Sequence, residues 1–189
     1  MGIKVIINNR VIKEDKGYYE NFIQIQDDGG SWSYFEMNFE RRHEPGKEEV
    51  KKFDNEKTAI KYFFLKTLRR FYFYKIHIPN NPIRSLQTIE ELKHFLENLG
   101  VSDERYSFNA IRPQEIYIET VDNKITVSYV DKNSQKKFTT MPLEIERGIF
   151  VAYKLAYSLH LLKNIEREYL QKNSLQETFS DDDIEFFIK

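Results

Sequence analysis

The chain has no cysteine among its 189 residues, and this absence excludes several kinds of chemistry. Disulfide bonds, thiolate metal sites and cysteine nucleophiles all need the missing side chain. The first ten residues also lack the basic start, apolar run and small-residue cleavage site of a secretory signal peptide. We therefore expect a cytoplasmic protein, because a reducing compartment is compatible with this composition.

Long uninterrupted apolar runs are missing as well. A membrane-spanning helix needs roughly 18 or more apolar residues with few charges. The longest apolar segment, residues 148–162, is interrupted by Lys154, Ser158 and His160. On a helix these few polar residues cannot form a wide solvent-facing side, so other parts of the protein must cover most of it. The sequence thus predicts no membrane partner and a central helix that lies on a sheet.

The motifs of common catalytic and metal sites are also missing. The four histidines fall in four different predicted elements without the HxxxH or HExxH spacing of a zinc site. The chain has no glycine-rich phosphate-binding motif and no Gly-x-Ser-x-Gly. Three successive carboxylates at residues 181–183 diverge and lack the alternate spacing of a calcium loop. We predict that the protein is not an enzyme and has no catalytic residue, metal ion or cofactor.

Three carboxylates remain as candidates for acid–base catalysis, because Glu36, Glu115 and Glu119 all lie on predicted strands. Charged residues are also common at solvent-facing strand positions, which explains the same residues without catalysis. His160, on the apolar helix, is interpreted as a hydrogen-bonded core residue.

Aromatic residues are abundant, at 15% of the chain, and they occur in segments with strand or helix periodicity. Strands are predicted at residues 3–7, 11–13, 22–26, 32–39, 106–110, 115–121 and 124–130. Helices are predicted at 57–74, with Asp54 as the cap, at 88–99, with a capping box from Thr88, and at 148–162, with an extension to about residue 172. The charged residues 40–52 are interpreted as a hairpin tip or solvated loop, residues 131–137 as a polar connection, and the tail as a capped terminal turn.

This order predicts an α+β fold with two related units of antiparallel strands followed by a long helix, the helices packed on one face of the sheet or sheets. Residues 1–84 form the N-terminal unit of strand hairpins plus a helix, and residues 85–189 form a C-terminal α-β-β-β-α unit with an acidic tail. The first unit has a net charge of +4 and the second one of −5. Such an asymmetry would orient the molecule in the field of a charged partner.

Residues 88–163 resemble the small α-β-β-β-α immunity proteins of bacterial polymorphic-toxin systems. The similar segments are TIEELKHFLENLGV (88–101), SFNAI (107–111), EIYIETVDNKITVSYVD (115–131) and the helix region from FTT (138–140) to AYKLAYSL (152–159). The resemblance implies a protein encoded beside a secreted toxin that protects the producing cell by binding the toxin domain. The implied partner is therefore a cognate protein toxin, and no functional residue is carried over from the family.

An immunity role needs only a complementary charged surface that associates fast and dissociates slowly. Because many toxin domains are basic nucleases, the acidic half of the chain is the expected docking face. Its candidate residues are Asp122, Asp131, Glu144, Glu146, Asp181, Asp182 and Asp183. A second candidate patch is the predicted hairpin tip at Asp27 and Asp28, with Trp32 nearby.

Two other functions stay open. The chain would be a single-stranded nucleic-acid binder if basic and aromatic residues of helix 57–74 contacted phosphates and bases, namely Tyr62, Lys66, Arg69, Arg70, Phe73 and Tyr74. The overall pI near 6.5 argues against this, and a second packing face explains the same residues. The third possibility is a phage or structural interaction module. The oligomeric state is left open, since an edge strand at residues 3–7 could pair across a dimer.

Overall fold

The computed structural model describes residues 3–17, 19–39, 46–78, 80–171 and 177–189. They form two compact units, which divide between Phe73 and Tyr74. The sequence places this boundary after residue 84, but the intervening segment belongs to the C-terminal unit. The Tyr153 hydroxyl donates a hydrogen bond to the Ile76 carbonyl oxygen and accepts one from the Asn81 amide, both at 3.1 Å. These buried bonds fix the segment to a C-terminal helix.

The N-terminal unit contains a five-stranded antiparallel meander. Its strands are β1 (Val5–Asn8), β2 (Val11–Glu14), β3 (Phe22–Asp27), β4 (Trp32–Asn38) and β5 (Gly46–Phe53), in that spatial order. Asn8 closes the first hairpin, because its side-chain oxygen accepts hydrogen bonds from the N–H groups of Arg10 and Val11. Gly29, with a φ of +85°, makes the tight turn between β3 and β4 that the sequence predicts.

Strand β5 corrects one prediction. The charged stretch 40–52 was expected to be a loop or hairpin tip, but its residues from Gly46 onward pair with β4; residues 40–45 lie outside the described residues. Most β5 side chains are exposed, so the strand shows no apolar alternation that would reveal it. Its lysine stems cover aromatic rings instead, as the Lys47 amine does at 3.7 Å from the Phe35 ring centroid.

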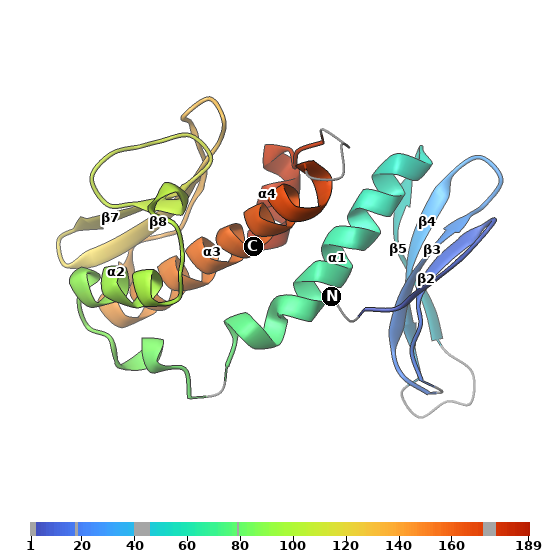
Figure 1. The fold of residues 1–189 in the computed structure, drawn as a ribbon, viewed down its shortest axis with the longest axis horizontal. Coiled ribbons are helices and arrows are strands. Elements are labelled where there is room, and N and C mark those ends of the chain that lie inside the picture. Colours follow the sequence, from blue (N-terminus) through green and yellow to red (C-terminus); the bar gives the residue numbers. More distant parts are fainter. Residues whose placement is uncertain (1–2, 18, 40–45, 79, 172–176) are drawn as a thin grey trace. The chain divides into compact units, whose positions relative to one another are not determined.

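Helix α1 (Glu56–Ile76) lies along one face of this sheet (Figure 1). Its cap is Asn55, whose side-chain oxygen accepts a hydrogen bond from the Thr58 N–H at 2.9 Å, so the predicted cap at Asp54 is wrong by one residue. Helix and sheet share an apolar core that consists of Ile12, Ile23, Ile25, Tyr34, Phe53, Ala59 and Phe63, with Trp32 and Tyr62 partly buried against it.

The buried side of α1 agrees only in part with helical periodicity, because Phe63 and Leu68 are buried as this periodicity predicts but Ile60 is not. Helical periodicity places Ile60 on the apolar side, and Tyr62 and Lys66 on the polar side. In the structure Ile60 is 39% exposed, whereas the Tyr62 ring packs against the Tyr34 ring and the Lys66 amine lies within 6 Å of both. The sheet supplies aromatic partners for a basic side chain, and these partners cannot be seen in the helix sequence alone.

The C-terminal unit contains helix α2 (Ile89–Asn98), and its predicted capping box between Thr88 and Glu91 is confirmed. The second sheet is built on β8 (Lys124–Val130), which pairs with β7 (Ile116–Val121) on one side. On its other side β8 pairs with β9 (Lys136–Thr139) and β10 (Leu143–Glu144), while β6 (Tyr106–Ser107) runs parallel to β7. Short 3₁₀ turns, η1 (Pro82–Ser85) and η2 (Asp103–Arg105), flank α2.

Helix α3 (Ile145–Ile165) contains the predicted central helix and packs on β7 and β8 (Figure 1). Gly148 allows the close approach, because a Cβ at this position would lie 2.4 Å from the Cβ of Ile125. A π-helical segment, η3 (Glu166–Gln171), continues α3. None of the helices within the described ranges combines the length and apolar character that a membrane crossing requires.

Three other segments differ from prediction. The strand expected at 106–110 ends at Ser107, whose hydroxyl donates a hydrogen bond to the Ala110 carbonyl oxygen at 2.6 Å and turns the chain. The polar connection after β8 contains β9. The tail forms a helix, α4 (Asp181–Ile188), with its own capping box at Ser180. An α+β architecture of sheets covered by long helices, as predicted, is confirmed.

Candidate functional site

The acidic residues predicted to form one docking face lie at two ends of β8. Asp122 is in the β7–β8 turn, and Glu144 pairs with Lys124 at the start of β8, with Glu146 in the first turn of α3. Asp131 and residues 181–183 lie at the other end. Seven residues of β8 separate the two groups by about 20 Å. The predicted face is therefore two smaller groups.

The group at the end of β8 is used largely by the fold itself. Asp131 accepts hydrogen bonds from two N–H groups of the β8–β9 turn, at 2.8 and 2.9 Å. Asp181 accepts one from the Tyr129 hydroxyl at 2.7 Å, and burial with this bond raises the pKa of Tyr129. Asp183 caps α4, and Asp182 forms an ion pair with Lys137 that lowers the pKa of its carboxyl.

Beside this group lies a buried polar network that was not predicted from the sequence. The amine of Lys163 contacts the Glu166 carboxylate at 2.8 Å and the Gln114 side chain at 3.2 Å. Glu166 also accepts a hydrogen bond from the Phe179 N–H at 2.6 Å. Because the network joins α3, the β6–β7 connection and the tail, its evident role is to hold α4 in place.

The second predicted patch, at the β3–β4 turn, is also partly structural. Asp27 accepts a hydrogen bond from the Gly29 N–H at 2.9 Å, and Asp28 accepts one from the Ser33 hydroxyl at 2.6 Å. Trp32 lies across from Asp27 and packs against the core of the N-terminal unit. The structure thus brings these three residues together, as predicted, but uses each of them in the turn or the core.

The basic face predicted on α1 is divided in the structure. Arg70 contacts the carboxylate of Glu14 at 2.9 Å, and this carboxylate, whose side chain is only 4% exposed, also accepts a hydrogen bond from the Ile23 N–H. Lys66 lies 3.9 Å from Glu36. Arg69 remains exposed. Lys66 and Arg70, two of the predicted phosphate ligands, therefore lie beside carboxylates of the same unit.

Two of the carboxylates considered for catalysis, Glu115 and Glu119, have separate basic partners. Glu115 is fully buried and held by the Arg112 guanidinium and by the Arg112 backbone N–H, each at 2.8 Å. Glu119 pairs with Lys136, while Glu36 belongs to the other unit. His160 is half-buried and hydrogen-bonded to Asn164. In the part of the chain that the structure describes, no group of three histidine or acidic residues is arranged to hold a metal ion.

The two edges of the N-terminal sheet differ in chemistry. At one edge, β5 carries charged residues at five of its eight positions, and a bulge at Val50 interrupts its pairing with β4. Charges and bulges are the usual means by which proteins prevent an edge strand from pairing with another chain. At the other edge, β1 exposes Val5 by 40%, Ile6 by 41% and Ile7 by 73%. One edge is protected, and the other is apolar and open.

The backbone of β1 has a defined set of outward groups. The Asp15 N–H donates to the Lys4 carbonyl oxygen at 2.9 Å, so this pair is hydrogen-bonded in the β1–β2 ladder. Hydrogen-bonded pairs alternate along an antiparallel ladder, which places Ile6 and Asn8 in the same class. The N–H and C=O groups of Val5 and Ile7 therefore point away from β2 and form the free edge.

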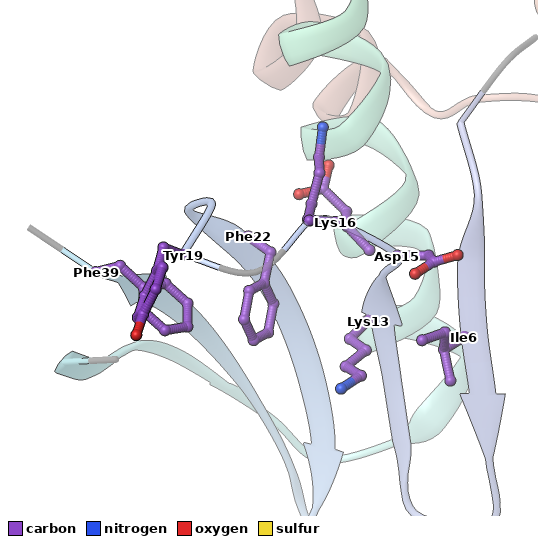
Figure 2. Close-up of a pocket in the computed structure, with 9 residues that line it drawn as sticks. Ile6, Lys13, Asp15, Lys16, Tyr19, Phe22 and Phe39 are labelled. Carbon is purple, nitrogen blue, oxygen red and sulfur yellow. The ribbon is translucent and has the colours of Figure 1, made fainter. Parts of the chain in front are cut away.

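An open hollow of about 190 Å³ lies next to this edge, on the face of the sheet opposite α1 (Figure 2). We call it the aromatic hollow; its lining includes Ile6, Lys13, Asp15, Lys16, Tyr19, Phe22 and Phe39. The Phe39 ring contacts the Tyr19 ring edge-on at 5.9 Å and the Phe22 ring at 6.3 Å. Figure 2 shows Phe22 between these two rings and the Lys13 side chain.

The hollow forms because β2 separates from β3. Lys13 is the last residue of β2 that pairs with β3, opposite Gln24. At the next position the Ile23 N–H donates a hydrogen bond to the Glu14 side chain, at 3.2 Å. The chain then leaves β2 and returns through Tyr19, whose φ of +68° is unusual for a residue other than glycine. The aromatic rings fill the space at this divergence only in part.

The hollow has an excess of positive charge. Lys13 and Lys16 form no ion pair with another described residue, and the Lys13 amine lies 5.7 Å from the Phe22 ring centroid. Glu14 and Asp15 also line the hollow. Glu14 is neutralised by Arg70. An acidic group would therefore be attracted to Lys13 and Lys16.

The residues of this site were not predicted from the sequence, although β1 was predicted as a strand that could pair at its edge. Phe22 and Phe39 read as ordinary strand residues, and only the topology shows which strand is at an edge. No protein-family model, curated protein or solved structure matches this chain. What the protein does must therefore be inferred from its own residues.

Proposed function

We propose that the chain is a non-catalytic protein-binding protein and that the open edge of β1 is its main contact surface. The observation that carries this proposal is the contrast between the two edges of one sheet: β5 is charged and bulged, whereas β1 exposes Val5, Ile6 and Ile7. An exposed apolar edge strand is a known hazard for aggregation. A binding role explains why such an edge is present, because main-chain hydrogen bonds at an edge can hold a partner strand.

We further propose that the partner is a cognate bacterial toxin and that the chain acts as its immunity protein. This proposal rests on the resemblance of residues 88–163 to immunity proteins. An alternative contact surface for the toxin is the acidic group at the start of β8, formed by Asp122, Glu144 and Glu146. Its charge is partly offset by Lys124, which lies 3.4 Å from Glu144.

The test is a growth-rescue assay with the reading frame that lies beside the gene. Its product is expressed in bacteria alone and together with the chain, and the complex is then purified with a tag on the chain. We expect the product alone to stop growth and the chain to restore it through a stoichiometric complex. A product that is harmless, or that forms no complex with the chain, would refute the proposal.

Matched variants identify the surface in the same assay. Ile7→Lys places a charge on the open edge, and Val50→Lys places the same charge on the protected edge, where Val50 is 46% exposed. Rescue should be lost with Ile7→Lys and kept with Val50→Lys. If the double variant Glu144→Lys with Glu146→Lys abolishes rescue and Ile7→Lys does not, the acidic group is the contact surface.

A further inference from the structure

We infer that the β1 edge and the aromatic hollow together bind an extended protein segment in which an apolar side chain and an acidic side chain alternate. This inference rests on the proposed protein-binding function and names the chemistry of the partner. The backbone of the segment would hydrogen-bond to the N–H and C=O groups of Val5 and Ile7. Its side chains would alternate between the two faces of the extended sheet.

The apolar requirement follows from the face on which the hollow lies. Val5 and Ile7 lie across from Glu14 and Ile12, which are on the α1 side, so Ile6 is on the opposite face and lines the hollow. A side chain of the added strand directly across from Ile6 would lie about 5 Å away from it. An aliphatic or aromatic residue at this position would bury exposed surface of Ile6.

The acidic requirement follows from charge. Lys13 is the neighbour of Ile6 across the β1–β2 ladder, and Lys16 follows on the connection that borders the hollow. Neither lysine has an ionic partner among the described residues. A carboxylate two positions along the added strand would be on the same face as the apolar side chain and within reach of a flexible lysine amine.

A nucleic acid fits these observations less well. Base stacking needs an accessible ring face, but the Tyr19 and Phe39 rings meet edge to face, at 81°, and the Lys13 amine is near the Phe22 ring. The apolar edge of β1 has no role in phosphate binding.

The experiment is a selection of linear peptides on the tagged full-length chain. A displayed library of random nine-residue peptides is enriched on the chain, and enriched peptides are synthesised and their dissociation constants measured by fluorescence anisotropy. We expect enriched sequences to carry an apolar residue two positions from Asp or Glu. The inference is overturned if no peptide is enriched, or if the enriched peptides lack the acidic residue.

Two variants test the geometry. Ile7→Pro removes one outward N–H but leaves the β1–β2 ladder intact, and we expect it to weaken peptide binding about tenfold. Lys13→Glu should weaken the binding of acidic peptides by a similar factor and strengthen the binding of peptides that carry Lys in place of the acidic residue. Val50→Lys is the control and should bind as the unmodified chain does. Equal binding by Ile7→Pro would overturn the inference, provided that unfolding curves show that the variant is folded.

Other occupants give different results. A dimer in sedimentation that Ile7→Pro dissociates would mean that a second copy occupies the edge. A labelled thymidine 12-mer that binds and displaces the peptides, with binding lost in Lys13→Glu but not in Ile7→Pro, would mean that the hollow takes nucleic acid. Each of these results overturns the inference. If the Ile7→Pro variant still rescues growth, the inference about the β1 edge is overturned, but the protein-binding function stands. If the unmodified chain does not rescue growth, the proposed function alone is refuted.

Discussion

Replacing Arg70 with methionine separates a structural role for this residue from a nucleic-acid contact. The Arg70 guanidinium lies 2.9 Å from a Glu14 carboxylate oxygen. The Glu14 side chain is 4% exposed, and its other donor in the described structure is the N–H of Ile23 at 3.2 Å. Arg70→Met therefore leaves a buried carboxylate with one neutral donor. A methionine keeps most of the apolar stem, so the loss is mainly one of charge.

The size of the effect follows from burial. Removing one partner of a fully buried ion pair costs about 3–5 kcal/mol, because the other charge is left without compensation. The Arg70 side chain is 44% exposed, so water already screens this pair and can reach Glu14 after the substitution. We therefore expect a loss of about 2 kcal/mol in the free energy of unfolding. Arg10→Met, at an exposed position in the β1–β2 turn of the same unit, should change it by no more than about 0.5 kcal/mol.

The assay is urea unfolding followed by tryptophan fluorescence. Trp32 is the single tryptophan of the chain and packs against the core of the N-terminal unit, so its signal reports the unit that contains both Glu14 and Arg70. Repeating Arg70→Met in a Glu14→Gln background should reduce its cost, because the neutral amide no longer needs a cation. The assignment of this ion pair would be refuted if Arg70→Met and Arg10→Met had equal effects, or if Arg70→Met cost as much beside Glu14→Gln as it does alone.

Three further predictions concern the C-terminal unit. Gly148→Ala should destabilise it by about 1–3 kcal/mol in urea unfolding, despite the better helix propensity of alanine, because the new methyl group would collide with Ile125. Burial lowers the pKa of His160, so below about pH 6.5 the unfolded chain takes up a proton that the folded protein does not. The free energy of unfolding should therefore fall as the pH drops below this value. His160→Gln should remove that part of the fall. Asp181→Asn weakens the bond to the Tyr129 hydroxyl by about 1 kcal/mol and should speed hydrogen exchange in α4.

Local chemistry made part of the fold predictable. The Thr88 capping box, the central helix and the β7–β8 hairpin depend on residues close in sequence, and each was placed correctly. The helix cap at Asn55 and the strand β5 were missed for different reasons. Two neighbouring cap formers are chemically equivalent, and a charged edge strand carries no apolar alternation.

The candidate site depends on contacts that are distant in sequence, and for this reason it could not be predicted. Arg70 and Glu14 are 56 residues apart, and nothing in the helix sequence shows that Arg70 has an acidic partner on a strand. The acidic residues near β8 show the converse: Glu144 and Asp131 are close in sequence but lie at opposite ends of one strand. Sequence proximity and net charge therefore predicted a single acidic face, but the strand topology places its residues in two separate groups.

A comparison of two paired isoleucines tests whether β1 is retained for folding or for binding. Ile7 and Ile12 are cross-strand partners, but Ile7 is 73% exposed and Ile12 is 9% exposed in the core. Ile12→Ala should cost about 2–4 kcal/mol in urea unfolding, because it removes buried methyl groups. Ile7→Lys removes little buried surface, and its cost should stay within about 0.5 kcal/mol. If Ile7→Lys destabilises the unit as much as Ile12→Ala, β1 is part of the core and its apolar residues need no partner. If it abolishes partner binding and leaves stability unchanged, folding does not explain the exposed Val5, Ile6 and Ile7, and binding does.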